Sequence, residues 1–344
     1  MTITKLAWRD LVPDSESYQD VFAQPDLAKE HEFILSDTQP RLHYALEQVL
    51  SPWATAPFML LKAPEEAEYL TLIGDAVRQL QPESNAVFGG QYRIAGHDVT
   101  FEPSTQADDR FAAKGEVITA NWVEAEQLFG CLRQFNGELS LQPGLVHRAN
   151  GGVLIISLRT LLSQPLLWMR LKTIVNQQRF DWVGYDESRP LPVAVPSMPL
   201  SLTVVLTGDR ESLADFQEME PELAEQAVYS EYEDNIQIAD ADDMTQWCQW
   251  VMTVAERFAL PAPAADAWPG LMREAVRYTG DQETLPLCPL WISKQLREVG
   301  VISGNGTFTG EQLAQMLAQR EWREGYLADR MQDEILLEQI LVET

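Results

Sequence analysis

The sequence predicts an α/β protein with a parallel sheet flanked by helices, followed by a small all-helical region and a long final helix. Short, fully apolar strand patterns alternate with helical patterns up to about residue 240. Strands that are apolar on both faces are typical of a parallel sheet covered on both sides. After Asp240 only helical patterns remain, and a length of 344 residues suits about two domains.

The α/β region begins with a helix, a strand and a second helix. Residues 1–37 precede them and are polar with scattered apolar side chains, so we expect an N-terminal arm. Apolar residues recur at helical spacing over 38–50, and PFMLLKA (57–63) is a short apolar strand. PEEAEYLTLIGDAVRQL (64–80) follows as a helix with Pro64 and acidic residues in its first turn. This order of elements is how a βαβ unit begins.

The rest of the α/β region alternates strands and helices. The expected elements are, in chain order, strand pieces over 81–120, a stretch over 121–135 that begins as a helix, an apolar strand over 153–156, a helix over about 163–178, an apolar strand over 201–209 and a strand over 232–240. Gly151 and Gly152 are expected to end a helix and to let the chain enter the strand tightly. Four helices are expected afterwards, over about 242–259, 266–279, 287–299 and 309–342.

Composition and charge narrow the classes of function. The formal net charge is −27, so the surface repels phosphate backbones and anionic lipid. No stretch approaches the roughly 20 apolar residues that a membrane helix needs, and the N-terminus lacks the apolar core of a signal peptide. We therefore expect a cytoplasmic protein with no nucleic-acid partner and no membrane partner, whose acidic residues serve solubility.

Cysteines and histidines do not indicate a metal site. The three cysteines are widely spaced and odd in number, which argues against a disulfide framework and a zinc site: Cys131, Cys248 and Cys288. The four histidines are dispersed, so neither a metal cluster nor a catalytic triad is suggested. His147 is expected to be a hydrogen-bonded residue of a helix or turn. We expect no metal and no catalytic residue in this chain.

Several segments resemble a known family. EAEQLFGCLRQFNG (124–137) and GLVHRANGGVLII (144–156) resemble the segment of LonB-like proteases that runs up to and through the Walker B strand. DTQPRLHYALEQVL (37–50) resembles the helix before their nucleotide loop, and residues 308–344 resemble the helical lead-in to a Lon peptidase domain. The resemblance implies an AAA+-like fold, and ATP and magnesium are the cofactors of the wider family.

The resemblance also implies a domain plan and a function. The expected parts are an N-terminal arm (1–37), an AAA+-like α/β domain (38–240), a helical lid domain (241–305) and a helical linker (306–344) toward a peptidase domain that would lie beyond Thr344. The chain would then be the regulatory and substrate-handling region of a Lon-like serine protease. Its expected partners are protein substrates, the peptidase domain of the same protein and, in the full-length protein, further copies of itself.

The phosphate loop is degenerate. Such a loop needs glycines whose N–H groups wrap the phosphates, a lysine for their charge and a Ser or Thr for magnesium. Placed after the first strand, these positions fall on KAPEEAEY (62–69). Lys62 and Ala67 then stand at the glycine positions, Glu68 at the lysine position and Tyr69 at the Ser/Thr position. Glu65, Glu66 and Glu68 repel a triphosphate and are expected to cap their own helix.

The remaining nucleotide-site positions are degenerate as well. Ser157 and Leu158 stand where a Walker B Asp-Glu pair would hold magnesium and activate water. Thr207 keeps a hydroxyl at the sensor 1 position, and no Lys or Arg between Arg210 and Arg257 could serve as an arginine finger. We therefore expect no bound nucleotide and no nucleotide hydrolysis.

Two other functions stay open. The chain could be an active ATP-dependent unfoldase with a non-standard site built from four residues: Lys62, Thr207, Asp209 and Lys294. Alternatively, it could be a non-enzymatic adaptor whose acidic surface binds basic proteins.

An aromatic residue beside glycine is also a feature of substrate-gripping pore loops. Phe129 with Gly130 is the first candidate for such a loop, and Phe88 and Tyr92 are the second. The alternative is that each aromatic is a core residue at a turn.

Overall fold

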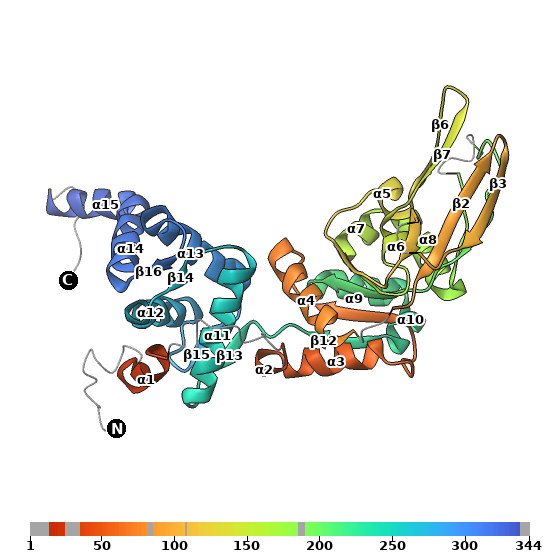
Figure 1. Ribbon diagram of the computed structural model, residues 1–344. Helices are drawn as coiled ribbons and strands as arrows, with labels where there is room; N and C mark the ends of the chain where they lie inside the picture. The colour runs from red at the N-terminus through yellow and green to blue at the C-terminus, as the bar shows by residue number, and fades with distance from the viewer. Residues whose placement is uncertain (1–13, 25–34, 82–84, 107–108, 185–189, 338–344) are drawn as a thin grey trace. The chain divides into compact units, whose positions relative to one another are not determined.

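A computed structural model describes residues 14–24, 35–81, 85–106, 109–184 and 190–337. The chain divides into two compact units (Figure 1). We call residues Gln39–Tyr232 the α/β unit, and Met1–Thr38 together with Glu233–Thr344 the helical unit.

A five-stranded parallel sheet forms the centre of the α/β unit. Its strands are, in order across the sheet, β12 (Val228–Glu231), β1 (Phe58–Lys62), β11 (Thr203–Gly208), β8 (Val153–Ser157) and β5 (Val117–Ala120). β8 is buried along its whole length, as expected for a strand covered on both faces. The sheet confirms the predicted α/β fold with flanking helices.

Helices flank the sheet, and aromatic side chains of two of them pack together, one also against a strand. α3 (Pro40–Leu50) and α4 (Ala67–Leu80) contact each other, and they contact β12 and β5, respectively. On α8 (Pro165–Gln177) and α9 (Arg210–Met219), Trp168 and Phe216 have ring centres 5.1 Å apart, and Trp168 also packs 5.9 Å from Phe58. Burial of such aromatic side chains is a large part of the stabilisation of the sheet. The other described helices of this unit are α5 (Ala125–Phe129), α6 (Leu145–Arg148), α7 (Leu158–Ser163) and α10 (Pro221–Gln226).

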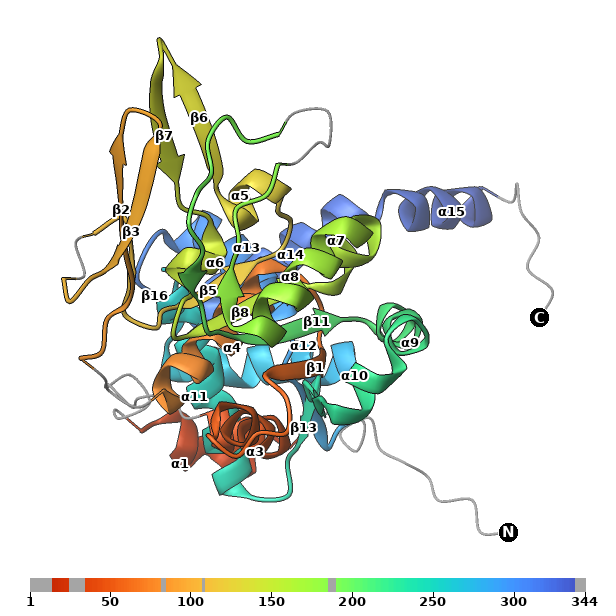
Figure 2. The same ribbon diagram turned by 90° about the vertical axis from the view of Figure 1, so that its right-hand side faces the viewer.

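Two hairpins project from the same side of the α/β unit (Figures 1 and 2). The first joins β2 (Phe88–Ala95) to β3 (Asp98–Pro103), and β4 (Phe111–Ala113) pairs with β2. The second joins β6 (Cys131–Phe135) to β7 (Glu138–Gln142). Strand pieces over 81–120 were expected, whereas the second hairpin was not. A further small pair joins β9 (Arg179–Phe180) to β10 (Met198–Pro199).

Several element boundaries differ from the prediction for local reasons. The helix expected to run from 121 ends at Phe129, because Gly130 has a left-handed φ of 72° and the chain then enters β6. The helix expected over about 163–178 is α8, which begins at Pro165, and the short helix α7 before it was not expected. α4 begins at Ala67, three residues after Pro64. β12 was missed, and the strand expected over 232–240 is the short β13 (Asn235–Gln237).

The helical unit contains the predicted helices and also short strands, so it is not purely helical. Its main helices are α11 (Ala241–Arg257), α12 (Trp268–Thr279), α13 (Pro289–Ser303), α14 (Gly310–Glu324) and α15 (Tyr326–Leu336). β13 pairs with β15 (Thr284–Pro286), and β14 (Ala262–Pro263) pairs with β16 (Thr307–Phe308). Because β13 pairs within the helical unit, that unit begins at Glu233, before the expected boundary at Asp240.

The start of the chain contributes to the helical unit. Part of the expected arm over 1–37 lies outside the described residues. The described part includes η2 (Glu16–Tyr18), α1 (Gln19–Phe22) and α2 (Leu35–Thr38). Phe22 stacks on Trp268 with 6.3 Å between ring centres. The arm is therefore packed against α12 at this point.

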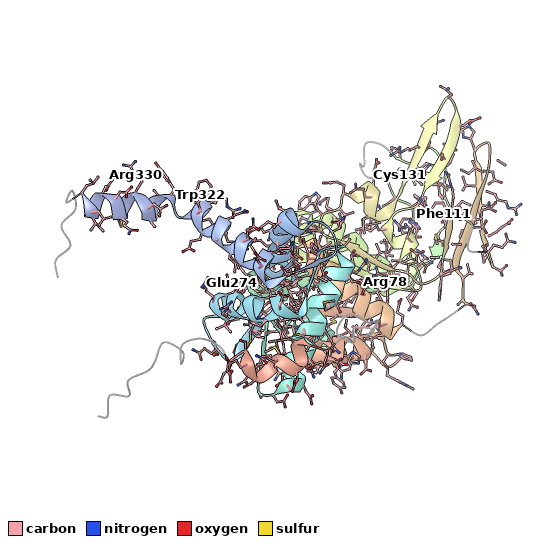
Figure 3. All side chains as sticks on the ribbon, turned by 60° about the vertical axis from the view of Figure 1, so that its left-hand side comes forward. Arg78, Phe111, Cys131, Glu274, Trp322 and Arg330 are labelled. Carbon is pink, nitrogen blue, oxygen red and sulfur yellow. The ribbon has the colours of Figure 1, made fainter. Side chains whose placement is uncertain are left out.

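The expected linker over 306–344 is two helices with different surroundings. Leu313 and Met316 of α14 are buried, and α14 contacts α12 and α13. α15 has no buried residue among those described, and Trp322 and Tyr326 are exposed (Figure 3). Gly325 separates the two helices. In the described part of the chain, no helix is both long and apolar enough to cross a bilayer.

Candidate functional site

The carboxyl ends of the parallel strands bring the predicted nucleotide-site positions to one edge of the sheet. Lys62 ends β1, Ser157 ends β8, and Thr207 is the residue of β11 paired with Ser157. In open α/β sheets, ligands bind outside this edge. The register therefore places the residues predicted to stand at the Walker A, Walker B and sensor 1 positions side by side, although they are far apart in sequence.

The loop after β1 crosses the end of β11 and reaches β8. The Ala63 amide donates to the Gly208 carbonyl over 3.1 Å. Two residues later, Glu65 Oε1 accepts hydrogen bonds from Ser157 Oγ at 2.6 Å and from the Arg159 amide at 3.1 Å. Arg159 Nε also lies 3.2 Å from Glu65 Oε2, and the Glu65 side chain is only 10% exposed. We call this set of contacts the Glu65 bridge.

The Glu65 bridge corrects the expectation for the acidic residues of the loop. Glu65 binds the start of α7, a helix that begins more than ninety residues later in the sequence. Glu66 is the N-cap of α4 but makes no side-chain capping hydrogen bond. Glu68 lies in the first turn of α4. The sequence predicted that Glu65 and Glu66 cap their own helix. In the structure, neither side chain does so.

The lysine of this edge is paired within the chain. Lys62 Nζ lies 2.6 Å from Glu231 Oε2, and the Tyr229 hydroxyl donates to Glu231 Oε1 over 2.8 Å. The hydrogen bond from Lys62, followed by that from Tyr229, lowers the pKa of Glu231 below its ordinary value. Burial and then the hydrogen bond to Glu231 raise the pKa of Tyr229 to about 12. The Lys62 ammonium therefore already neutralises a carboxylate of this chain.

The positions that would hold magnesium and activate water are occupied by packed side chains. Tyr69 is buried, with its ring 5.1 Å from that of Tyr232. Leu158 is fully buried, and a Cβ placed on Gly208 would lie 3.0 Å from its Cδ1. Thr207 is fully buried with its hydroxyl 3.4 Å from the Ile156 carbonyl oxygen. Tyr, Leu and Thr carry no carboxylate, so these three side chains supply none to hold magnesium or to orient water at this edge.

Other residues considered for the nucleotide site have structural roles, are exposed in first helical turns or belong to the helical unit. Asp209 caps α9 by accepting from the Ser212 amide at 2.8 Å, and this bond lowers the pKa of Asp209. Ala67 and Arg210 are exposed in the first turns of α4 and α9. Lys294 is an exposed residue of α13 in the helical unit.

The residues at the edge do not fit a magnesium–triphosphate. The loop over 62–69 contains no glycine, its lysine is paired, and the Walker B position of Leu158 is apolar and buried. The Glu65 carboxylate is held by Ser157 and Arg159. In the described parts of the chain, no group of three or more His, Cys, Asp or Glu side chains could hold a metal ion.

Each candidate pore-loop aromatic has contacts within the α/β unit. Phe129 is 1% exposed, and the Arg170 guanidinium lies 4.3 Å from its ring centre. Phe88 lies against Gly151, where an added Cβ would lie 2.1 Å from the Phe88 ring. The Tyr92 hydroxyl donates to the Pro196 carbonyl over 2.8 Å, and burial raises the pKa of Tyr92 to about 12. The burial of Phe129 contradicts a substrate-gripping role for this residue and agrees with the alternative of a core residue at a turn. Phe88 and Tyr92 lie on β2 and are partly buried.

His147 and the two glycines also have structural roles. The His147 ring is fully buried beside Phe180 and Trp182, and its Nδ1 accepts from the Gly144 amide at 3.0 Å. Burial and then the charge of Arg170 lower the pKa of His147 to about 3. A Cβ on Gly152 would lie 2.3 Å from the Glu116 carbonyl oxygen. The close approach expected at Gly152 is therefore present.

Sequence reasoning missed Arg159, Glu231 and Tyr229. Arg159 stands in the first turn of α7, where its amide is unsatisfied within the helix. A buried acceptor for that amide could have been anticipated, but its identity could not. Glu231 and Tyr229 were missed because β12 was missed.

The chain is similar to known proteins along its whole length. Residues 114–227 match the sequence model of the family described as "LonB-like, AAA domain". The chain is 66% identical over 344 residues to a protein of Escherichia coli (strain K12) named "Putative Lon protease homolog". A protein of the same name from Haemophilus influenzae is 32% identical over 298 residues, which cover 84% of this chain. The chain spans 59% of the length of the first relative and 49% of the second.

Solved structures with some likeness include crystal structures of NtrX from Brucella abortus. One has a TM-score of 0.46 at 12% identity and covers 77% of this chain and 51% of NtrX. Another, in complex with ATP, has a TM-score of 0.44 at 13% identity and covers 90% of this chain and 63% of NtrX. The AAA+-like fold is supported by the parallel sheet and by the family match.

Proposed function

We propose that this chain, a Lon-like AAA+ portion, is a regulatory and substrate-handling region that has lost nucleotide hydrolysis. The observation that carries the proposal is the state of the sheet edge, where Lys62 is paired with Glu231 and Leu158 is buried. Nucleotide hydrolysis of this type needs a free cation for the phosphates and carboxylates that hold magnesium and orient water. The pairing of Lys62 and the apolar side chain of Leu158 support the proposal that the fold is retained without this chemistry.

In the longer protein, we propose that proteolysis is carried by a C-terminal serine peptidase domain acting on protein substrates. The names of the two relatives and their greater length support this proposal. The net charge of −27 supports a cytoplasmic protein without nucleic-acid or membrane partners. Assembly into a homo-oligomer belongs to the proposal for the full-length protein, because AAA+ regions commonly act as rings.

Calorimetry and phosphate release test the loss of nucleotide chemistry. The 344-residue chain is titrated with near-millimolar Mg-ATP and Mg-ADP, and released phosphate is followed over hours. We expect no saturable binding and no phosphate above the level of a buffer control. A one-to-one isotherm, or phosphate release that Lys62→Ala abolishes, would overturn the proposal and favour the active unfoldase.

The acidic adaptor is separated from the proposed function by work on the full-length protein. Cleavage of a protein substrate by that protein supports a proteolytic role. If the full-length protein captures basic partners in a salt-sensitive manner and cleaves none of its tested substrates, the adaptor is favoured instead.

A further inference from the structure

We infer that the Glu65 carboxylate occupies the predicted nucleotide site as a ligand from the chain itself. By binding Ser157 and Arg159, it holds the loop after β1 against the start of α7 in one conformation without nucleotide. This inference rests on the proposed function, because it names what holds the site closed once nucleotide chemistry is lost. In the sheet, β11 lies between β1 and β8. The Glu65 side chain therefore extends from the loop after β1 over the end of β11 to the first turn of α7.

The contacts of Glu65 are those of a ligand rather than of a surface ion pair. Its carboxylate is 10% exposed and accepts from both a hydroxyl and a main-chain amide, at 2.6 and 3.1 Å. Hydrogen bonds to a charged acceptor are stronger than neutral ones. The Arg159 side chain, by contrast, is 73% exposed, so its ion pair is screened by water and adds little.

The bridge couples the loop after β1 to the start of α7, which follows β8, a strand separated from β1 by β11. On one side it fixes the four residues between β1 and α4. On the other it satisfies the amide of Arg159, one of the first N–H groups of α7, which have no partner within that helix. Loss of the carboxylate should therefore free both segments together, since the loop would lose its attachment and the Ser157 hydroxyl and the Arg159 amide would lose their acceptor.

Hydrogen exchange with a matched pair of variants tests the inference. Glu65→Ala removes the bridge, whereas Glu66→Ala removes the same charge from an exposed neighbour that makes no capping bond. For Glu65→Ala, we expect amide exchange to rise at least about tenfold both at Ala63, whose amide donates to the Gly208 carbonyl, and at Arg159. Its thermal midpoint should fall by about 4–8 °C. Glu66→Ala should change neither value beyond error.

The outcomes separate this inference from the proposed function. Unchanged exchange at Arg159 in Glu65→Ala, or equal changes in Glu66→Ala, would overturn the inference. If the wild-type chain binds Mg-ATP while Glu65→Ala shows the expected exchange, the proposed function fails and the bridge stands. If the chain binds no nucleotide and Glu65→Ala exchanges like the wild type, the proposed function stands and the bridge fails. Glu65→Gln, which keeps an acceptor oxygen, should lose protection less than Glu65→Ala.

Discussion

Lys62 and Glu231 are register partners at the ends of two neighbouring parallel strands, and their side chains form an ion pair of 2.6 Å. The pair joins β1 to β12 at the edge of the sheet where the degenerate nucleotide positions lie. It also explains why the one lysine in the loop is not available to an anion.

The first prediction concerns this pair. Burial is the largest cause of the raised pKa of Tyr229 and remains in Glu231→Gln, whereas the hydrogen bond to the carboxylate and its charge are lost. Glu231→Gln should therefore lower the pKa of Tyr229 from about 12 part of the way toward that of a free tyrosine. Ultraviolet titration of tyrosinate, with Tyr229→Phe to assign the signal, measures this change. Stability at neutral pH should fall by only about 0–1 kcal/mol, since both partners are substantially exposed. An unchanged titration in Glu231→Gln would contradict the contact.

The second prediction concerns the Walker B position. Leu158→Glu places a carboxylate where such a residue would activate water, but the site is fully buried. We expect a loss of several kcal/mol of unfolding free energy in urea and no phosphate release. Leu166→Glu on α8, where Leu166 is 81% exposed, is the control and should change stability by less than about 0.5 kcal/mol. Phosphate release by Leu158→Glu would show that the rest of the site is competent.

The third prediction concerns acid stability and His147. The folded pKa of His147 is lowered to about 3, below an unfolded value of about 6.5. Between these values the unfolded chain binds more protons than the folded one, so the contribution of His147 is present above pH 6.5 and is lost as the pH falls toward 3. The slope from this group is at most about 1.4 kcal/mol per pH unit.

The measurement is urea unfolding from pH 7 to pH 4 for the wild type and two variants. His147→Gln should be less stable at pH 7 and should show a shallower decline toward acid. His97→Gln, at an exposed position in the turn between β2 and β3, should keep the wild-type slope. Equal slopes for the wild type and His147→Gln would contradict a neutral, buried His147.

The fourth prediction concerns the entry into β8. Gly152→Ala should cost roughly 1–3 kcal/mol or more, because its Cβ would lie 2.3 Å from a main-chain oxygen of Glu116, which cannot move freely. Gly137→Ala is the comparison, since Gly137 has a φ of 86° and open space around it. It should cost only about 1 kcal/mol, the strain of a left-handed alanine. Similar unfolding free energies for the two variants would contradict a close approach at Gly152.

The central strands were predictable because burial on both faces requires an unbroken apolar sequence. β1, β8 and β11 are such runs, and each ends within a residue or two of its predicted limit. β12 carries no such run, since it is only partly buried at the edge of the sheet. The β6–β7 hairpin was missed because its sequence also suits a helix, and the turn at Gly130 decides between them.

By itself, the sequence determined which side chains end β1, β8 and β11, because their apolar runs fix where each of these strands stops and parallel strands share one edge. It also determined that this edge lacks a glycine loop and a Walker B carboxylate pair. Only the tertiary structure decided which partners these side chains take. Glu65 meets Ser157, Lys62 meets Glu231, and Phe129 enters the core. Such contacts depend on strand order and on the course of a loop, and residues so far apart in sequence carry no local signal of them.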